Sequence, residues 1–156
     1  MEGLANLVPR VEEAHSRVAA LGLPDLATHG DAHPMNALSG PAGSLWFDWS
    51  EAGVAHPFLD AGWFFAWFGH PAKANLPVRR EHPDAVGQLW AQYLDALEAR
   101  EAERALPDAV LLALVHRAVA FDQRFRDWQG TVPGWRPQYV PYYLRLALRA
   151  GEQFAR

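Results

Sequence analysis

The chain has 156 residues, 50% hydrophobic and 21% charged, with a formal net charge of −4, which excludes a disordered chain and fits one domain over residues 1–156. It contains no cysteine, which excludes disulfide frameworks and thiol chemistry. It contains no basic block, so we expect no nucleic-acid partner. No signal peptide and no apolar run of the ~20 residues that cross a bilayer is present, so we expect a cytoplasmic protein that binds no membrane.

The first predicted helix follows Pro9, because apolar residues then recur every three or four positions, and Gly22 ends it. Prolines and glycines break residues 23–35 into an irregular loop. Two strand-like runs, 36–38 and 44–49, flank a turn rich in glycine and predict a β-hairpin.

Helical patterns dominate the rest of the chain. They cover residues 57–68, 83–97, 107–128 and 138–154, with loops at 69–83 and 129–137. The predicted fold class is therefore mainly α, with four or five helices and one short β-hairpin that follows an irregular loop.

The most informative stretch is Thr-His-Gly-Asp-Ala-His-Pro-Met-Asn at 28–36, followed by Leu-Trp-Phe-Asp-Trp at 45–49. Asp31 and Asn36 are separated by a proline-containing loop, and Asp48 ends a hydrophobic strand. Phosphoryl transfer from ATP needs a carboxylate to orient the attacking hydroxyl, and amide and carboxylate oxygens to hold Mg²⁺. Because a hairpin joins the two segments, we expect Asn36 and Asp48 to lie together at its open end.

This stretch resembles the catalytic and metal-binding loops of the aminoglycoside phosphotransferase/choline kinase-like family, which are relatives of the protein kinases. Residues 29–36 match the family's H-G-D-x-x-x-x-N loop, and residues 47–49 match its metal-binding Asp followed by Trp. Residues 55–60 resemble its G-x-P-x-x-D segment, with Ala55 in place of glycine. The close matches cover residues 28–67, whereas the flanking helices agree only in number and order.

The resemblance implies an ATP-dependent phosphotransferase that acts on a hydroxyl of a small molecule, with Mg²⁺ and ATP as cofactors. It implies Asp31 as the catalytic base and Asn36 and Asp48 as the ligands of Mg²⁺ and nucleotide. It also implies that His29 and Asp60 support the catalytic loop.

The family's amino-terminal lobe, which covers ATP and supplies a strand lysine, has no counterpart before the first predicted helix; the only lysine, Lys73, lies far downstream. The chain therefore resembles the helical carboxy-terminal lobe alone. We expect it to fold by itself, to be incomplete as an enzyme, and to self-associate through the apolar face that would meet the missing lobe.

We expect the acceptor to bind against the later helices. The aromatic run at residues 63–68 is expected to lie mainly in the core, with one or two of its rings open to an acceptor pocket, since aromatic rings flank cations and sugars. The candidates for this pocket are Glu51, Trp63, Trp67 and Trp128. The arginines of the later helices are expected on a solvated face, with pairing to Asp122 or Asp127 open to two of them; these are Arg117, Arg124 and Arg126.

Two other classes of function stay open. A non-catalytic binding or regulatory module would keep the helical lobe without the nucleotide-covering lobe. A metal-dependent hydrolase would use His29, Asp31 and His33, because alternate residues of an extended segment share one face and imidazole and carboxylate suit Zn²⁺. The hydrolase hypothesis leaves Asn36 and Asp48 unexplained.

Overall fold

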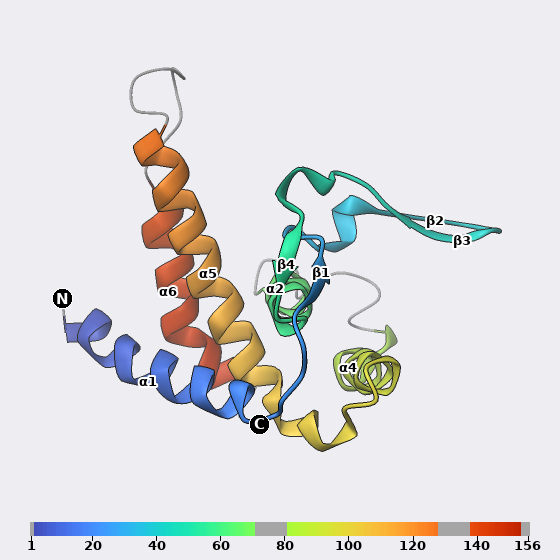
Figure 1. Ribbon diagram of the computed structural model, residues 1–156, viewed down its shortest axis with the longest axis horizontal. Helices are drawn as coiled ribbons and strands as arrows, with labels where there is room; N and C mark the ends of the chain where they lie inside the picture. The colour runs from blue at the N-terminus through green and yellow to red at the C-terminus, as the bar shows by residue number, and fades with distance from the viewer. Residues whose placement is uncertain (1, 71–80, 128–137, 154–156) are drawn as a thin grey trace.

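A computed structural model of the chain describes residues 2–70, 81–127 and 138–153 (Figure 1). Five α-helices lie among these residues: α1 (Glu2–Ala19), α2 (Phe58–Phe68), α4 (Ala85–Ala96), α5 (Leu106–Asp127) and α6 (Tyr139–Gln153). The short elements are β1 (Leu26–Thr28), η1 (Pro34–Asn36), β2 (Ala37–Gly40), β3 (Gly43–Trp46), η2 (Trp49–Glu51), β4 (Gly53–Ala55) and η4 (Arg100–Ala105), where η denotes a 3₁₀ helix. The prediction of a mainly α fold is confirmed.

One hydrophobic core joins all five of these helices. The long helix α5 is central: it packs against α2 and against its antiparallel neighbour α6, and α1 crosses both α5 and α6 at one end (Figure 1). The contact between α2 and α5 depends on Gly62, because a Cβ at this position would collide with the carbonyl of Ala109. This close packing brings one face of α5 next to the segment that precedes α2.

The first helix is longer than predicted, because α1 begins at Glu2 and contains Pro9 in its interior. A proline inside a helix lacks an N–H donor and crowds the preceding turn, which is why we placed the start there. Leu7 is buried in the same core as Ala14 and Val18. Burial of Leu7 stabilises the turns before Pro9, at ~1.5–3 kcal/mol for a fully buried large apolar side chain.

The later helices were predicted to within a few residues. α4 begins directly after Asp84. Pro107 lies in the first turn of α5, where backbone N–H groups have no acceptor within the helix, so proline is tolerated there. The 3₁₀ helix η4 was not predicted. The predicted loops at 69–83 and 129–137 fall mainly outside the described residues.

The hairpin is confirmed, and a second strand pair was missed. β2 and β3 pair antiparallel, with Leu38 opposite Leu45, and project away from the helices (Figure 1). β1 lies in the stretch predicted as a loop and pairs antiparallel with β4, with Thr28 opposite Gly53. Three-residue strands are too short to show a period, and their partners are distant in sequence. The β1–β4 pair joins the two ends of the segment that holds the candidate site.

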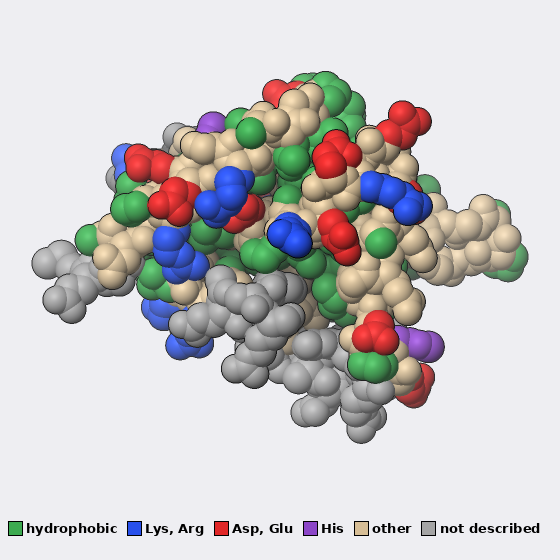
Figure 2. All heavy atoms as spheres, turned by 90° about the horizontal axis from the view of Figure 1, so that it is seen from below, with side chains coloured by type: hydrophobic (Ala, Val, Ile, Leu, Met, Phe, Trp, Pro, Cys, Tyr) green, Lys and Arg blue, Asp and Glu red, His purple; other side chains and the backbone are tan. Residues whose placement is uncertain are grey.

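None of the described helices is both long enough and apolar enough to cross a lipid bilayer. Figure 2 shows acidic and basic side chains interspersed on one face of the molecule. Charges on the helices form ion pairs, between α1 and α5 in Arg17 with Asp108 and within α5 in Arg126 with Asp122, each at 2.8 Å. The second pair is one of those that the sequence left open, and exposed pairs of this kind contribute only ~0.2–1 kcal/mol.

Candidate functional site

Asp60, in the first turn of α2, binds the backbone of the loop at residues 29–36, called the 29–36 loop below. Its two carboxylate oxygens accept hydrogen bonds from the N–H of His29 at 2.5 Å and of Gly30 at 2.9 Å. Gly30 has a φ of +78°, and a Cβ there would collide with the carbonyl of Glu51. Glycine adopts this conformation without strain. Asp60 and Gly30 together orient the backbone that carries Asp31.

His29 connects the 29–36 loop to the end of the hairpin. Its ring is buried, with Nδ1 accepting the N–H of Asp31 at 3.3 Å and Nε2 lying 2.8 Å from the carbonyl oxygen of Phe47. These partners assign the proton to Nε2, which donates to the carbonyl. Both ring nitrogens are therefore used inside the protein, and Phe47 is attached to the loop.

Asn36 holds the same hairpin end from the other side. Its backbone carbonyl accepts the N–H of Phe47 at 3.0 Å, and its side-chain Nδ2 donates to the backbone carbonyl of Asp31 at 3.1 Å. Nδ2 also lies 3.4 Å from Oδ2 of Asp31. With its nitrogen directed to Asp31, the amide presents Oδ1 as the atom that a cation would use.

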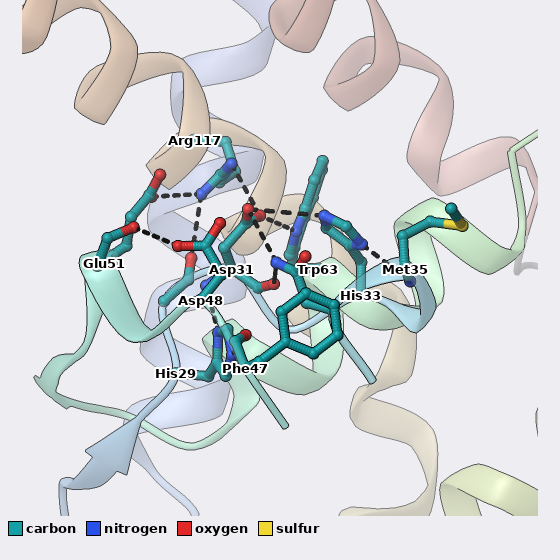
Figure 3. A network of polar contacts seen from close by, with 12 residues as sticks. His29, Asp31, His33, Met35, Phe47, Asp48, Glu51, Trp63 and Arg117 are labelled. Carbon is teal, nitrogen blue, oxygen red and sulfur yellow. Dashed lines mark hydrogen bonds and ion pairs between the residues drawn. The ribbon is translucent and has the colours of Figure 1, made fainter. Parts of the chain in front are cut away.

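Asp48 follows Phe47 directly and lies at a bend, with φ and ψ of 62° and 59°. This left-handed conformation is uncommon for residues with a side chain, and Asp is among those that tolerate it. The Asp48 carboxylate accepts a hydrogen bond from Ser50 Oγ at 2.8 Å, and Figure 3 shows it extending toward Asp31 and Arg117. A carboxylate and an amide oxygen are hard ligands of the type that Mg²⁺ prefers, so Asn36 and Asp48 fit this ion by their chemistry.

Asp31 is paired with an arginine that we expected on a solvated face. Its Oδ1 lies 2.9 Å from Nη2 of Arg117 and accepts the indole N–H of Trp63 at 2.8 Å (Figure 3). Arg117 is only 5% exposed and also donates to the carbonyl of Gly30 at 3.0 Å. Its guanidinium lies over the Trp63 ring, 4.7 Å from the centroid. The prediction of a solvated Arg117 is wrong.

The sequence did contain a signal for Arg117. It lies on the buried stripe of α5, four residues after Ala113, three after Leu114 and four before Phe121. An arginine at a core position of an amphipathic helix needs an internal partner, because an unpaired buried charge is strongly destabilising.

Glu51, in η2, lies between two arginines of α5. Its Oε2 is 2.6 Å from Arg117 Nη1 and its Oε1 is 2.8 Å from Arg124 Nη1. Arg124, with a side chain 34% exposed, pairs with Glu51 and is only partly in contact with solvent. These ion pairs attach η2, the segment that follows Asp48, to α5, the helix whose Arg117 also binds Asp31.

A cavity of about 380 Å³ lies beside Asp31 and includes two predicted acceptor residues, Trp63 and Trp67. Glu51 is not among the described residues that line it. Glu51 instead lines a smaller cavity of about 170 Å³ between β4 and α5. Trp128, the fourth predicted acceptor residue, lies outside the described part of the chain.

His33 approaches Asp31, with Nε2 lying 3.6 Å from Oδ2, but His29 does not join the two around a common centre. The Nδ1 of His33 accepts the N–H of Met35 at 3.2 Å, and its ring stacks on Trp67 with centroids 5.9 Å apart. Over the described residues, no three His, Cys, Asp or Glu side chains form a group that could hold a metal ion. Because both nitrogens of His29 already have partners, this geometry disfavours the hydrolase hypothesis.

Comparisons with known proteins yield no relative of this chain. A scan against protein-family models finds no matching family, and neither the curated proteins nor the solved structures contain a match. The functional interpretation therefore depends on the residues and contacts described above.

Proposed function

We propose that this chain is the helical lobe of an ATP-dependent phosphotransferase that resembles the aminoglycoside phosphotransferase/choline kinase-like enzymes and phosphorylates a hydroxyl of a small molecule. One observation carries the proposal: Phe47 is bound on one side by His29, at 2.8 Å, and on the other by Asn36, at 3.0 Å. These bonds hold Asp48 beside the loop that carries Asp31. The three residues that the reaction needs thus come from two segments joined by direct hydrogen bonds.

In the proposed reaction Asp31 accepts the proton of the acceptor hydroxyl. The hydroxyl oxygen bonds to the γ-phosphorus of ATP while the bond from that phosphorus to the β-phosphate oxygen breaks, and ADP leaves. Arg117 and Trp63 hold Oδ1 of Asp31 at 2.9 and 2.8 Å. Oδ2 has only the longer contacts, to Asn36 Nδ2 at 3.4 Å and His33 Nε2 at 3.6 Å, and is the oxygen proposed to take the proton. Asn36 and Asp48 would hold Mg²⁺, which supplies charge neutralisation at the phosphates when bound.

The proposal is tested with Mn²⁺, which takes the same oxygen ligands as Mg²⁺ and broadens the NMR signals of nearby nuclei. Adding Mn·ATP to the ¹⁵N-labelled chain should broaden backbone signals near Asn36 and Asp48, and Asp48→Ala should remove this effect. The control is Asp84→Ala, since Asp84 makes no capping hydrogen bond through its side chain. Broadening that Asp48→Ala leaves unchanged, or that centres elsewhere, would overturn the metal assignment.

A non-catalytic binding module is the second candidate, and the ion pair between Asp31 and Arg117 favours it. A carboxylate that already binds a buried guanidinium and an indole has less freedom to receive a substrate proton. The two candidates differ in turnover: the module binds Mn·ATP or an acceptor without forming ADP, whereas the phosphotransferase forms ADP in an acceptor-dependent way when complete.

The hairpin supports the proposal that another protein surface covers this side of the molecule. Large apolar side chains are exposed on and beside it: Met35, Leu38, Leu45, Phe47 and Trp49. Leu38 and Leu45 are 60% and 65% exposed and lie opposite each other in the pair of strands. Exposed apolar patches of this kind are typical of interfaces, and we propose self-association through this hairpin.

A further inference from the structure

We propose that the cavity beside Asp31 takes a neutral, hydroxylated ring compound and discriminates against polycations. The use of that compound as a phosphate acceptor rests on the proposed function, whereas its binding does not. The inference depends on the shape, the aromatic walls and the charge balance of this cavity.

The cavity is formed by four separate parts of the fold. The 29–36 loop contributes Asp31 and His33, α2 contributes Trp63 and Trp67, and α6 contributes Tyr142 and Tyr143. Arg117 of α5 closes the end next to Asp31, as Figure 3 shows for the group around Asp31, Trp63 and His33. Its volume of about 380 Å³ lies within the range of small-molecule sites, ~300–1,000 Å³.

The aromatic walls favour a flat ligand. Trp63 and Tyr143 meet edge to face with centroids 5.6 Å apart, and His33 stacks on Trp67. Tyr142 Oη lies 2.9 Å from Nε2 of His70, which places a polar pair at the cavity wall. Rings and apolar groups such as Leu146 provide contact area, while Asp31 Oδ2 and the Tyr142 hydroxyl can bond to ligand hydroxyls.

The charge balance excludes a polycation. Asp31 is the one carboxylate among the described residues that line the cavity, and its Oδ1 is paired with Arg117 at 2.9 Å. Residues 71–80 and 128–137 contain lysine or arginine and neither Asp nor Glu, so they bring no carboxylate to any site. A ligand with several ammonium groups would lose its hydration next to a guanidinium without gaining anionic partners.

The tyrosine side chains of the cavity, Tyr142 and Tyr143, add no negative charge to it. Burial raises the pKa of Tyr142 above its ordinary value, and burial is also the main cause that raises the pKa of Tyr143. Both side chains are therefore uncharged at neutral pH. The cavity carries no anion other than the paired carboxylate among its described residues.

A matched pair of probes tests the inference: phenyl β-D-glucoside, which is neutral, and 3,5-bis(aminomethyl)phenyl β-D-glucoside, which carries two ammonium groups at pH 7. Binding is measured by NMR shift titration without nucleotide. The neutral probe should bind at least tenfold more tightly, with shifts at residues of the 29–36 loop, α2 and α6. Equal or tighter binding of the cationic probe would overturn the proposal.

Two variants locate the binding site. Leu146→Trp should fill the cavity and abolish binding of phenyl β-D-glucoside, whereas Leu4→Trp, at an exposed position of α1, should leave the dissociation constant unchanged. Trp67→Leu is the alternative test if circular dichroism shows that Leu146→Trp is unfolded. It removes an aromatic wall and should weaken binding about tenfold. Unchanged binding in folded Trp67→Leu would contradict the assignment of the site.

The two proposals fail in different ways. Binding of the neutral probe in the cavity, with no Asp48-dependent broadening by Mn·ATP, would support the ligand class and refute the metal site on which the phosphotransferase depends. Broadening by Mn·ATP at Asp48, with neither probe bound, would support the metal site and refute the ligand class.

Discussion

Arg117 of α5 and Asp31 of the 29–36 loop form an ion pair of 2.9 Å although they are far apart in the chain. The same guanidinium binds Glu51 and the carbonyl of Gly30, so one side chain holds the loop before the hairpin and the turn after it. The position of Asp31 is thereby tied to the packing of α5 against α2.

Replacing Arg117 by Gln should lower the free energy of unfolding by about 3 kcal/mol or more, because two carboxylates lose a buried partner. Arg117→Lys should recover only part of this loss, since an ammonium cannot bind several acceptors in the planar geometry of a guanidinium. Urea denaturation gives the values. Arg126→Gln, which breaks an exposed pair, is the control and should change stability by less than ~1 kcal/mol.

Gly30→Ala should destabilise the protein more than Gly22→Ala does. Both glycines have positive φ, so each substitution introduces backbone strain of ~1–2 kcal/mol. Only at position 30 would the new Cβ collide, with the backbone of Glu51, whereas at position 22 nothing lies within 4 Å. Equal melting temperatures for the two variants would show that the 29–36 loop and η2 are not in close contact.

Stability should decrease as the pH falls below ~6.5, the ordinary pKa of histidine. Burial lowers the pKa of His56 in the folded protein; Asp25 opposes this with a smaller effect, and His15 lowers the pKa a little further. The unfolded chain then binds the proton more readily than the folded one, so stability present above pH 6.5 is lost as the pH falls through the lowered pKa.

His56 Nδ1 accepts the N–H of Phe58 at the start of α2, a bond that an Asn side chain can replace. His56→Asn should therefore reduce the pH dependence, measured as urea midpoints between pH 5 and 8. Some dependence should remain, because burial also lowers the pKa of His116. His82→Asn, at an exposed position, should behave as the parent protein does.

Asp31→Asn should lower turnover by ~10²–10⁴-fold in any preparation of the protein that transfers phosphate, because an amide cannot take the hydroxyl proton. The amide can still accept the indole N–H of Trp63, so the fold should persist, with some loss of stability from the broken ion pair. Acceptor-dependent ADP release measures the rate. Near-parental turnover would exclude Asp31 as the base.

Leu38→Lys together with Leu45→Lys should shift the protein toward the monomer in sedimentation velocity experiments. The two side chains lie opposite each other on the exposed hairpin, and two like charges there repel both each other and a second copy. Because neither side chain is buried, the helical core should be unaffected. A sedimentation coefficient that is identical to the parent's at every concentration would argue against an interface at the hairpin.

The helices and the hairpin could be predicted from local pattern. α2 is marked by a sequence that is apolar nearly all round, and α2 and α5 by Pro57 and Pro107 at their starts. β2 and β3 are marked by their short glycine-containing turn. The hairpin also predicted that Asp48 returns to the vicinity of the 29–36 loop, because a short turn brings the second strand back alongside the first. The predicted start of α1 was wrong because the burial of Leu7 stabilises the helix before Pro9 by more than Pro9 destabilises it.

The contacts that define the site were decided by tertiary structure. The stripe on α5 shows that Arg117 faces inward, but its pairing with Asp31 and Glu51 depends on how α5 is rotated and packed against α2 at Gly62. The pairing of β1 with β4 likewise joins segments whose sequences are too short to specify a partner. Local patterns determine which face of an element is buried, because that follows from its own period. The contacts between side chains of distant elements depend on how those elements pack, because packing sets the distances between charges and between hydrogen-bonding groups.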